Sequence, residues 1–121
     1  MAVELNHTIV PSRDKEAAAR FVSHVLGLPE PGRASHFVTV AMANGVTLDF
    51  DDAQTVQPQH YAFLVSADEF AAIFDRVRAM AIGYWADPGH RRPGEVYDRG
   101  AGRGFYFEDP SGHNLEVLTQ A

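Results

Sequence analysis

Apolar and polar residues alternate near the start of the chain, as they do on a strand with one buried face. The residues that share this face are Val3, Leu5, His7 and Ile9. The pair Pro11-Ser12 is predicted to end the strand. Helical spacing follows in Ala18, Phe21, Val22, Val25 and Leu26, with Gly27 as the C-terminal cap. Two further strands, over 36–41 and 46–50, are predicted to form a hairpin around Asn44-Gly45.

The same order of elements then begins again. A strand is predicted over 60–65, and Ser66 with Glu69 forms a capping box at the start of a second helix that ends near Gly83. The apolar stripe of this helix is Phe70, Ile73, Phe74 and Val77. Residues 87–103 show no periodicity and are predicted to form a long loop. The chain closes with a hairpin whose turn is Asp109-Pro110-Ser111-Gly112.

The two halves of the chain match as an internal repeat. When His7 is aligned with His60, Glu16 falls on Glu69 and Phe21 on Phe74. When Asp49 is aligned with Glu116, Gly45 falls on Gly112 and Leu48 on Leu115. We therefore predict an α+β domain over 1–121 made of two β-α-β-β-β modules, about 1–52 and 58–121. Their sheets would form a cup around a cleft.

Composition narrows the classes of function. The net charge of −6 and the pI of about 5.4 disfavour nucleic-acid binding, which needs a basic face. No apolar run is long enough to cross a membrane, and the N-terminus lacks the pattern of a signal peptide, so we expect a cytoplasmic protein. The chain has no cysteine, so any metal site must use histidines and carboxylates.

Each module opens with a histidine and ends with a carboxylate. Two imidazoles and one carboxylate, from His7, His60 and Glu116, suit a divalent metal and match the ligand types of non-haem iron sites. The alternative is that Glu116 simply occupies the solvated face of an antiparallel strand. Its equivalent in the first module, Asp49, is either part of the site or a solvated residue beside Asp51 and Asp52.

The doubled module, with His7, His60 and the run from Tyr106 through Asp109-Pro110 to Glu116, resembles the vicinal oxygen chelate superfamily. This superfamily includes glyoxalase I, extradiol dioxygenases, fosfomycin resistance enzymes and bleomycin-binding proteins. The resemblance implies a glyoxalase-like fold and makes His7, His60 and Glu116 the metal ligands. It also implies that Tyr106 lies beside the substrate as a catalytic residue.

The resemblance leaves three functions open. The first is a metal-dependent enzyme, such as an extradiol-type dioxygenase, acting on a small substrate with two adjacent oxygens. Fe(II) is the favoured ion, with Mn(II), Ni(II) or Zn(II) as alternatives. The dioxygenase signature carries a histidine before the Phe-Tyr pair, where this chain has Tyr97, Asp98 and Arg99. The second function is a glyoxalase-like lyase or isomerase with Asp49 as fourth ligand, and the third is metal-free drug binding.

Two further expectations concern the long loop and the assembly. The loop carries four arginines that either clamp an anionic substrate or remain hydrated: Arg91, Arg92, Arg99 and Arg103. Four aromatic residues are candidates for the wall of a pocket, with core packing an equal alternative for Phe105: Trp85, Tyr97, Phe105 and Tyr106. Two modules of this kind would bury their outer edges in a homodimer, in which one site could take ligands from both chains.

Overall fold

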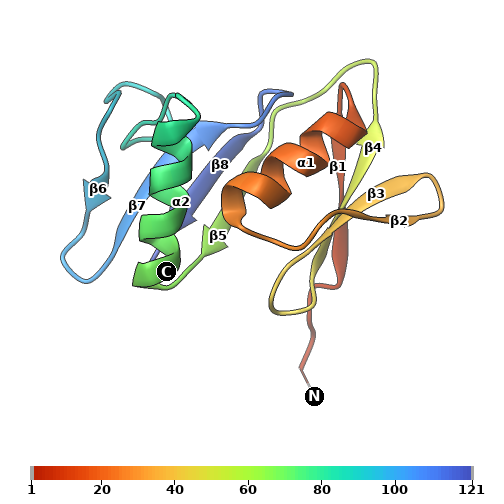
Figure 1. The fold of residues 1–121 in the computed structure, drawn as a ribbon, viewed down its shortest axis with the longest axis horizontal. Helices are drawn as coiled ribbons and strands as arrows, with labels where there is room; N and C mark the ends of the chain where they lie inside the picture. The colour runs from red at the N-terminus through yellow and green to blue at the C-terminus, as the bar shows by residue number, and fades with distance from the viewer. Residues whose placement is uncertain (1, 121) are drawn as a thin grey trace. The chain divides into compact units, whose positions relative to one another are not determined.

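The computed structural model describes residues 2–120 and divides into two compact units, the first ending at Gln57 and the second beginning at Pro58. The first unit contains β1 (His7–Ser12), α1 (Lys15–Leu26), β2 (Gly32–Ala34), β3 (Phe37–Ala41) and β4 (Thr47–Asp52) (Figure 1). The second contains β5 (His60–Leu64), α2 (Ala67–Ala79), β6 (Tyr97–Asp98), β7 (Arg103–Glu108) and β8 (Asn114–Leu118). Each unit follows the order β-α-β-β-β, which confirms the predicted α+β class.

The two sheets share one topology. Their strand orders are β1-β4-β3-β2 and β5-β8-β7-β6, with the first pair parallel and the other pairs antiparallel. The register repeats as well: His7 lies opposite Thr47, and His60 lies opposite Asn114. Thr47 and Asn114 are equivalent positions in the repeat, so the repeat found in the sequence extends to the pairing of single residues.

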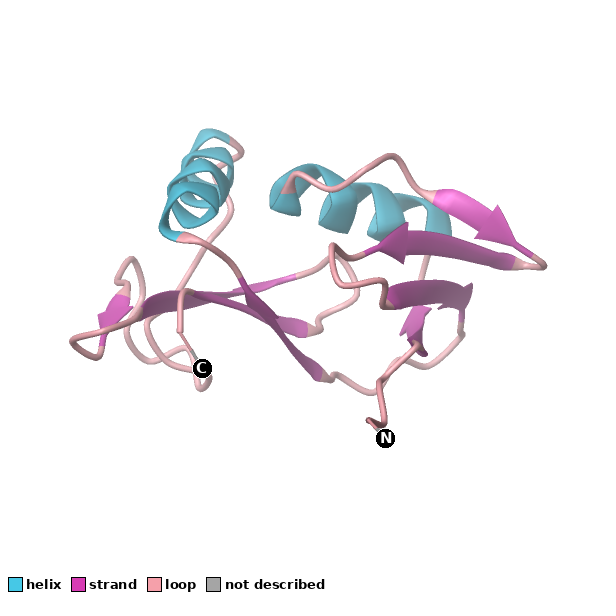
Figure 2. Ribbon diagram, turned by 90° about the horizontal axis from the view of Figure 1, so that it is seen from below, coloured by secondary structure: helices cyan, strands magenta, loops and turns pink. Residues whose placement is uncertain are grey.

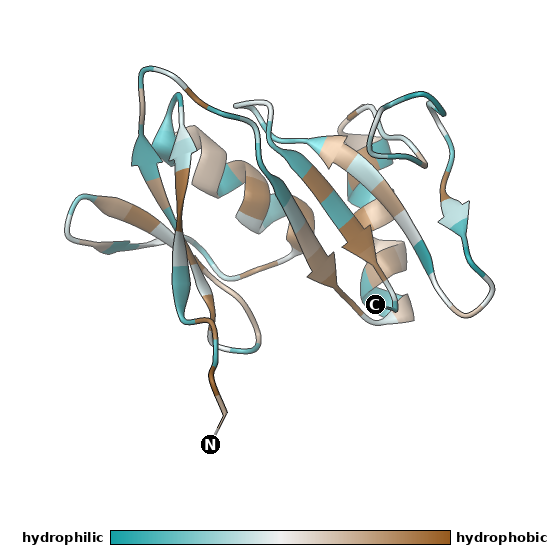
Figure 3. Cartoon of the chain, turned by 180° about the vertical axis from the view of Figure 1, so that it is seen from behind, coloured by the Kyte–Doolittle hydropathy of each residue, from teal (hydrophilic) through white to brown (hydrophobic). Residues whose placement is uncertain are grey.

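Each helix covers one face of the sheet in its own unit (Figure 2). The apolar residues that alternate along the strands face the helix, because a strand directs successive side chains to opposite faces. In β8 these are Leu115 and Val117, both fully buried, and the alternation along β7 and β8 is visible in Figure 3. Glu116 therefore points to the face that α2 does not cover.

Both helices are capped as predicted. Gly27 adopts a left-handed conformation with φ of 69° at the end of α1. Ser66 and Glu69 form the capping box of α2, in which each side chain accepts a hydrogen bond from the other residue's backbone N–H. Helix α2 ends at Ala79, earlier than predicted, because Ala81 already has a positive φ of 55°.

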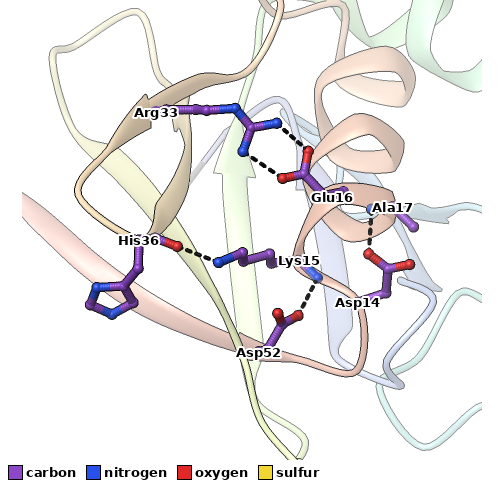
Figure 4. A network of polar contacts seen from close by, with 7 residues as sticks. All are labelled: Asp14, Lys15, Glu16, Ala17, Arg33, His36 and Asp52. Atoms are coloured by element: carbon purple, nitrogen blue, oxygen red, sulfur yellow. Dashed lines mark hydrogen bonds and ion pairs between the residues drawn. The ribbon is translucent and has the colours of Figure 1, made fainter.

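Polar contacts join the start of α1 to the strands of the first unit (Figure 4). The Lys15 ammonium group donates to the backbone oxygen of His36, and the Lys15 backbone N–H donates to the Asp52 carboxylate. Arg33 on β2 makes a bidentate ion pair with Glu16 in the first turn of α1. These contacts tie the start of the helix to β2, to β4 and to the residue before β3.

The prediction for the first strand was wrong in its limits and in its buried face. Strand β1 begins at His7 and continues through Pro11, and its buried residues are Val10 and Ser12. Proline is tolerated there because β1 is an edge strand that pairs only with β4. The short strands β2 and β6 were not predicted, since two or three residues show no periodicity. Among residues 2–120, no helix is long and apolar enough to cross a membrane.

Candidate functional site

The second unit gathers polar side chains on the face of its sheet opposite α2. Strand β8 lies between β5 and β7, and Glu116 is opposite Ala62 on one side and Tyr106 on the other. His60 is opposite Asn114, two residues before Glu116 and on the same face. Pairing across three strands thus places His60, Tyr106 and Glu116 together, which are three of the residues predicted from the sequence.

Glu116 is a buried carboxylate whose two oxygens have different partners. Only 7% of its surface is exposed. Its Oε1 lies 2.9 Å from Nε2 of His60, and its Oε2 accepts a hydrogen bond of 2.5 Å from the Tyr97 hydroxyl group. Burying a carboxylate raises the free energy of the folded state unless the carboxylate is paired with a hydrogen-bond donor or an opposite charge. The interpretation of Glu116 as a solvated strand residue is therefore wrong.

Tyr106 stands beside this pair as a neutral phenol. Its ring centroid is 5.6 Å from that of His60. Burial raises the pKa of Tyr106, and the negative charge of Glu116 raises that pKa further. The ordinary pKa of a tyrosine already keeps the hydroxyl group protonated at neutral pH, so the raised pKa only reinforces this state, in which the group can donate a hydrogen bond. Burial and the hydrogen bond to Glu116 also raise the pKa of Tyr97.

The loop that follows α2 is anchored to the same part of the sheet. The backbone of Trp85 exchanges two hydrogen bonds with Tyr106, and its indole ring stacks on His90 at a centroid distance of 3.8 Å. His90 Nε2 lies 3.0 Å from Oδ1 of Asn114. The Asp87 carboxylate fixes the loop by accepting hydrogen bonds from the backbone N–H groups of Arg91 and Arg92. The contact between His90 and Asn114 was not predicted, because it depends on a loop without periodicity.

Three of the four loop arginines contact different side chains. Arg99 lies over the ring of Tyr97 at 4.6 Å, while Arg103 covers Phe70 on the opposite, helix-facing side. Arg92 pairs with Glu95 at 2.9 Å. Of the four predicted pocket aromatics, Phe105 is fully buried in the core against Phe70, so it does not belong to the polar face.

His7 and Asp49 belong to the first unit. His7 is exposed, and its Nδ1 lies 2.7 Å from Oδ1 of Asn6. Asp49 is half-buried and accepts a hydrogen bond of 2.9 Å from the Thr47 hydroxyl group. Within residues 2–120, no three His, Cys, Asp or Glu side chains are grouped as in a metal site. Of the three predicted metal ligands, His60 and Glu116 are in contact with each other.

The donor atoms present fit a divalent metal. An imidazole nitrogen and a carboxylate oxygen at hydrogen-bonding distance are two ligands that Fe(II), Mn(II), Ni(II) and Zn(II) all accept. The Tyr97 hydroxyl supplies the additional hydrogen bond that ligating carboxylates usually receive. The site therefore has two candidate ligands and an outer partner for one of them.

A family of known proteins matches nearly the whole chain, including both copies of the repeated module. Residues 4–117 match the family model of the Glyoxalase/Bleomycin resistance protein/Dioxygenase superfamily. The chain belongs to this superfamily. The predicted glyoxalase-like fold is therefore confirmed.

Two solved structures have sequences that are more than half identical to this chain. The chain is 52% identical to oxidase ChaP-H1, with a TM-score of 0.96 over 99% of this chain and 98% of that one. It is 54% identical to oxidase ChaP-H2, with a TM-score of 0.96 over 100% and 96%. It is also 29% identical to glutathione transferase FosA of Serratia marcescens, over 97% of this chain and 81% of that protein.

Proposed function

We propose that the protein is a metal-dependent enzyme that uses dioxygen to oxidise a small substrate with two adjacent oxygen atoms, in the manner of an extradiol-type dioxygenase. The observation that carries the proposal is the 2.9 Å contact between His60 Nε2 and Glu116 Oε1 beside the neutral phenol of Tyr106. The identity of 52% and 54% to two proteins named oxidases supports the oxidative reaction over the other chemistries of the superfamily.

Each site residue has a defined role in this proposal. His60 and Glu116 hold the ion, with His7 as the third ligand, and Fe(II) is the favoured ion. When bound, the metal would polarise two adjacent substrate oxygens as a Lewis acid and, as Fe(II), supply electrons to dioxygen. Tyr106 donates a hydrogen bond to a substrate oxygen, because its ring lies beside that of His60 and its hydroxyl group is protonated at neutral pH.

Metal content and oxygen uptake test the proposal together. Wild-type protein loaded anaerobically with Fe(II) is expected to hold about one ion per chain and to consume dioxygen with a catechol. His60→Ala is expected to lose both properties, while the control His24→Ala, changed at an exposed position on α1, keeps them. An unchanged iron content in His60→Ala would refute the site. A wild type without metal would instead favour metal-free binding of a drug-like ligand.

A second candidate is group transfer from a thiol. The 29% identity to a protein named glutathione transferase FosA supports this candidate. Glutathione addition consumes no dioxygen, so loss of free thiol without oxygen uptake would favour it. The glyoxalase-like lyase or isomerase also takes up no dioxygen, and it differs by requiring Asp49 as a ligand.

We also propose that the protein is a cytoplasmic homodimer. Strands β1 and β5 each lie at one edge of their own sheet, and they carry the exposed apolar residues Ile9 and Leu64. Such edges are normally covered, and a second copy of the chain would cover them.

Mixing two inactive variants tests whether one site uses both chains. If His7 comes from the partner, a mixed dimer of His7→Ala and His60→Ala contains one intact site and regains activity. If His7 comes from the same chain, the mixture stays inactive. Sedimentation of the unmixed variants controls for assembly.

A further inference from the structure

Tyr97 reaches the site through a gap left by a glycine. On the paired strands β6 and β7, Tyr97 lies opposite Gly104. A Cβ atom at position 104 would lie 2.2 Å from the Tyr97 hydroxyl oxygen and 2.3 Å from its Cζ, distances that nonbonded atoms do not reach. Gly104 is not among the glycines with positive φ. Space for the tyrosine, and not backbone conformation, therefore requires glycine here.

The tyrosine crosses this gap to bind one oxygen of Glu116. Its hydroxyl group donates to Oε2, while Oε1 faces Nε2 of His60. Both Tyr97 and Glu116 are buried, with 9% and 7% of their surfaces exposed. A partial rotation of the carboxylate would break both contacts, so the tyrosine holds one oxygen toward the histidine and keeps the other engaged.

The fold itself does not need this arrangement. In the first unit the equivalent pair on β2 and β3 is Ala34 opposite Phe37, with the large and small residues exchanged. The sheet forms there with the same topology. Asp49, the equivalent of Glu116, receives its hydrogen bond from Thr47 on its own strand. The sheet topology thus does not require the Tyr97–Gly104 pair, which brings the Tyr97 hydroxyl group to the carboxylate while the Tyr97 ring packs in a cluster with Ala86 and Tyr106.

From these contacts we propose that Tyr97 is a positioning residue for Glu116, which makes Glu116 bind a metal through Oε1 alone. The proposal rests on the metal site proposed above. With Oε2 held by the hydroxyl group, one coordination position that a bidentate carboxylate would fill stays free for a substrate oxygen. Outer partners of this kind typically change metal affinity about 10- to 100-fold.

Co(II) binding to Tyr97→Phe tests the proposal without requiring activity. The variant keeps the buried ring and loses only the hydroxyl group, and its Co(II) dissociation constant is expected to rise about 10- to 100-fold. Because Oε2 is then free to bind, the coordination number rises and the visible ligand-field absorption of Co(II) weakens. A purely structural role for Tyr97 would not change this spectrum. The control is Tyr84→Phe, since Tyr84 is half-buried and its ring packs against Phe74 and Phe105.

Gly104→Ala provides a second test in which the hydroxyl group is still present. The added methyl group displaces the Tyr97 ring, so Co(II) affinity is expected to fall to a similar extent. The double variant Gly104→Ala/Tyr97→Phe is expected to be no weaker than either single variant, because both remove the same contact. Melting of the metal-free proteins verifies that each variant is folded.

Two results would overturn the proposal in distinguishable ways. If wild type binds Co(II) and Tyr97→Phe shows the same affinity and spectrum, the positioning role is refuted while the metal site stands. If wild type binds no Co(II), the metal site is refuted, and the positioning role with it.

Discussion

Asp49 and Glu116 occupy the same position in two copies of one module, yet their surroundings differ. Glu116 is buried and contacts His60 and Tyr97 from two other strands. Asp49 is half-buried, and its hydrogen bond comes from Thr47 on its own strand. The comparison shows that topology and register place a carboxylate on this face, whereas the neighbouring side chains decide whether it becomes part of a site.

The two cores differ in a related way. The first core is mainly aliphatic, with Val10, Val38, Val40 and Leu48 around Phe50. The second is aromatic, with ring contacts among Phe70, Phe74, Tyr84, Phe105 and Phe107. The same order of elements therefore holds two kinds of packing, and the aromatic core lies beneath the sheet that carries the candidate site.

The largest expected effect comes from the aromatic core. Phe105→Ala should lower the free energy of unfolding by about 3–5 kcal/mol, because it leaves a cavity beneath β7. The matched change in the first unit, Val38→Ala, should cost only about 2 kcal/mol, since it removes two buried methyl groups. Urea unfolding at constant m-value measures both changes. Equal losses in the free energy of unfolding would show that the two cores contribute equally to stability.

Next in size is the effect of the two matched carboxylates on metal binding. Glu116→Gln should abolish stoichiometric binding of Co(II), because the amide removes the charged ligand. Asp49→Asn should weaken binding by less than about 10-fold, as expected for a residue outside the ligand set. Equilibrium titration of both variants measures the difference. An equal loss in both would make Asp49 a ligand and favour the lyase or isomerase alternative.

The smallest expected effect concerns Glu16 and Glu69, which are equivalent first-turn residues. The hydrogen bond from Arg33 lowers the pKa of Glu16, whereas the backbone N–H of Ser66 lowers the pKa of Glu69. Both groups favour the folded state above the ordinary glutamate pKa of 4.5, and this contribution is lost as the pH falls through the lowered value. Arg33→Gln should raise the pKa of Glu16 toward its ordinary value and leave that of Glu69 unchanged. Carboxyl carbon NMR titration measures both, and a joint shift would contradict the assignment of partners.

The repeat in the sequence explains why much of the fold and part of the site could be predicted. Aligning the halves identified His60 and Glu116, and alternation in β8 placed Glu116 away from the core. Tyr97 was predicted only as a pocket wall. Its bond to Glu116 depends on a two-residue strand and on the gap at Gly104, and neither leaves a periodic signal. The sequence also misplaced β1, because the tolerance of Pro11 follows from its edge position.

The turn between β7 and β8 limits how the gene for this protein can change in length. The Asp109 carboxylate accepts hydrogen bonds from the backbone N–H groups of Ser111 and His113, and Gly112 closes the turn with φ of 91°. One inserted codon here would shift β8 by one residue, which would turn Glu116 into the core and Val117 out of it. The exposed residues Gln54 and Thr55 lie between β4 and β5, outside the strands, so codons added there leave the register of both sheets intact. Natural or engineered length variation should therefore gather at that point and be absent between Glu108 and Asn114.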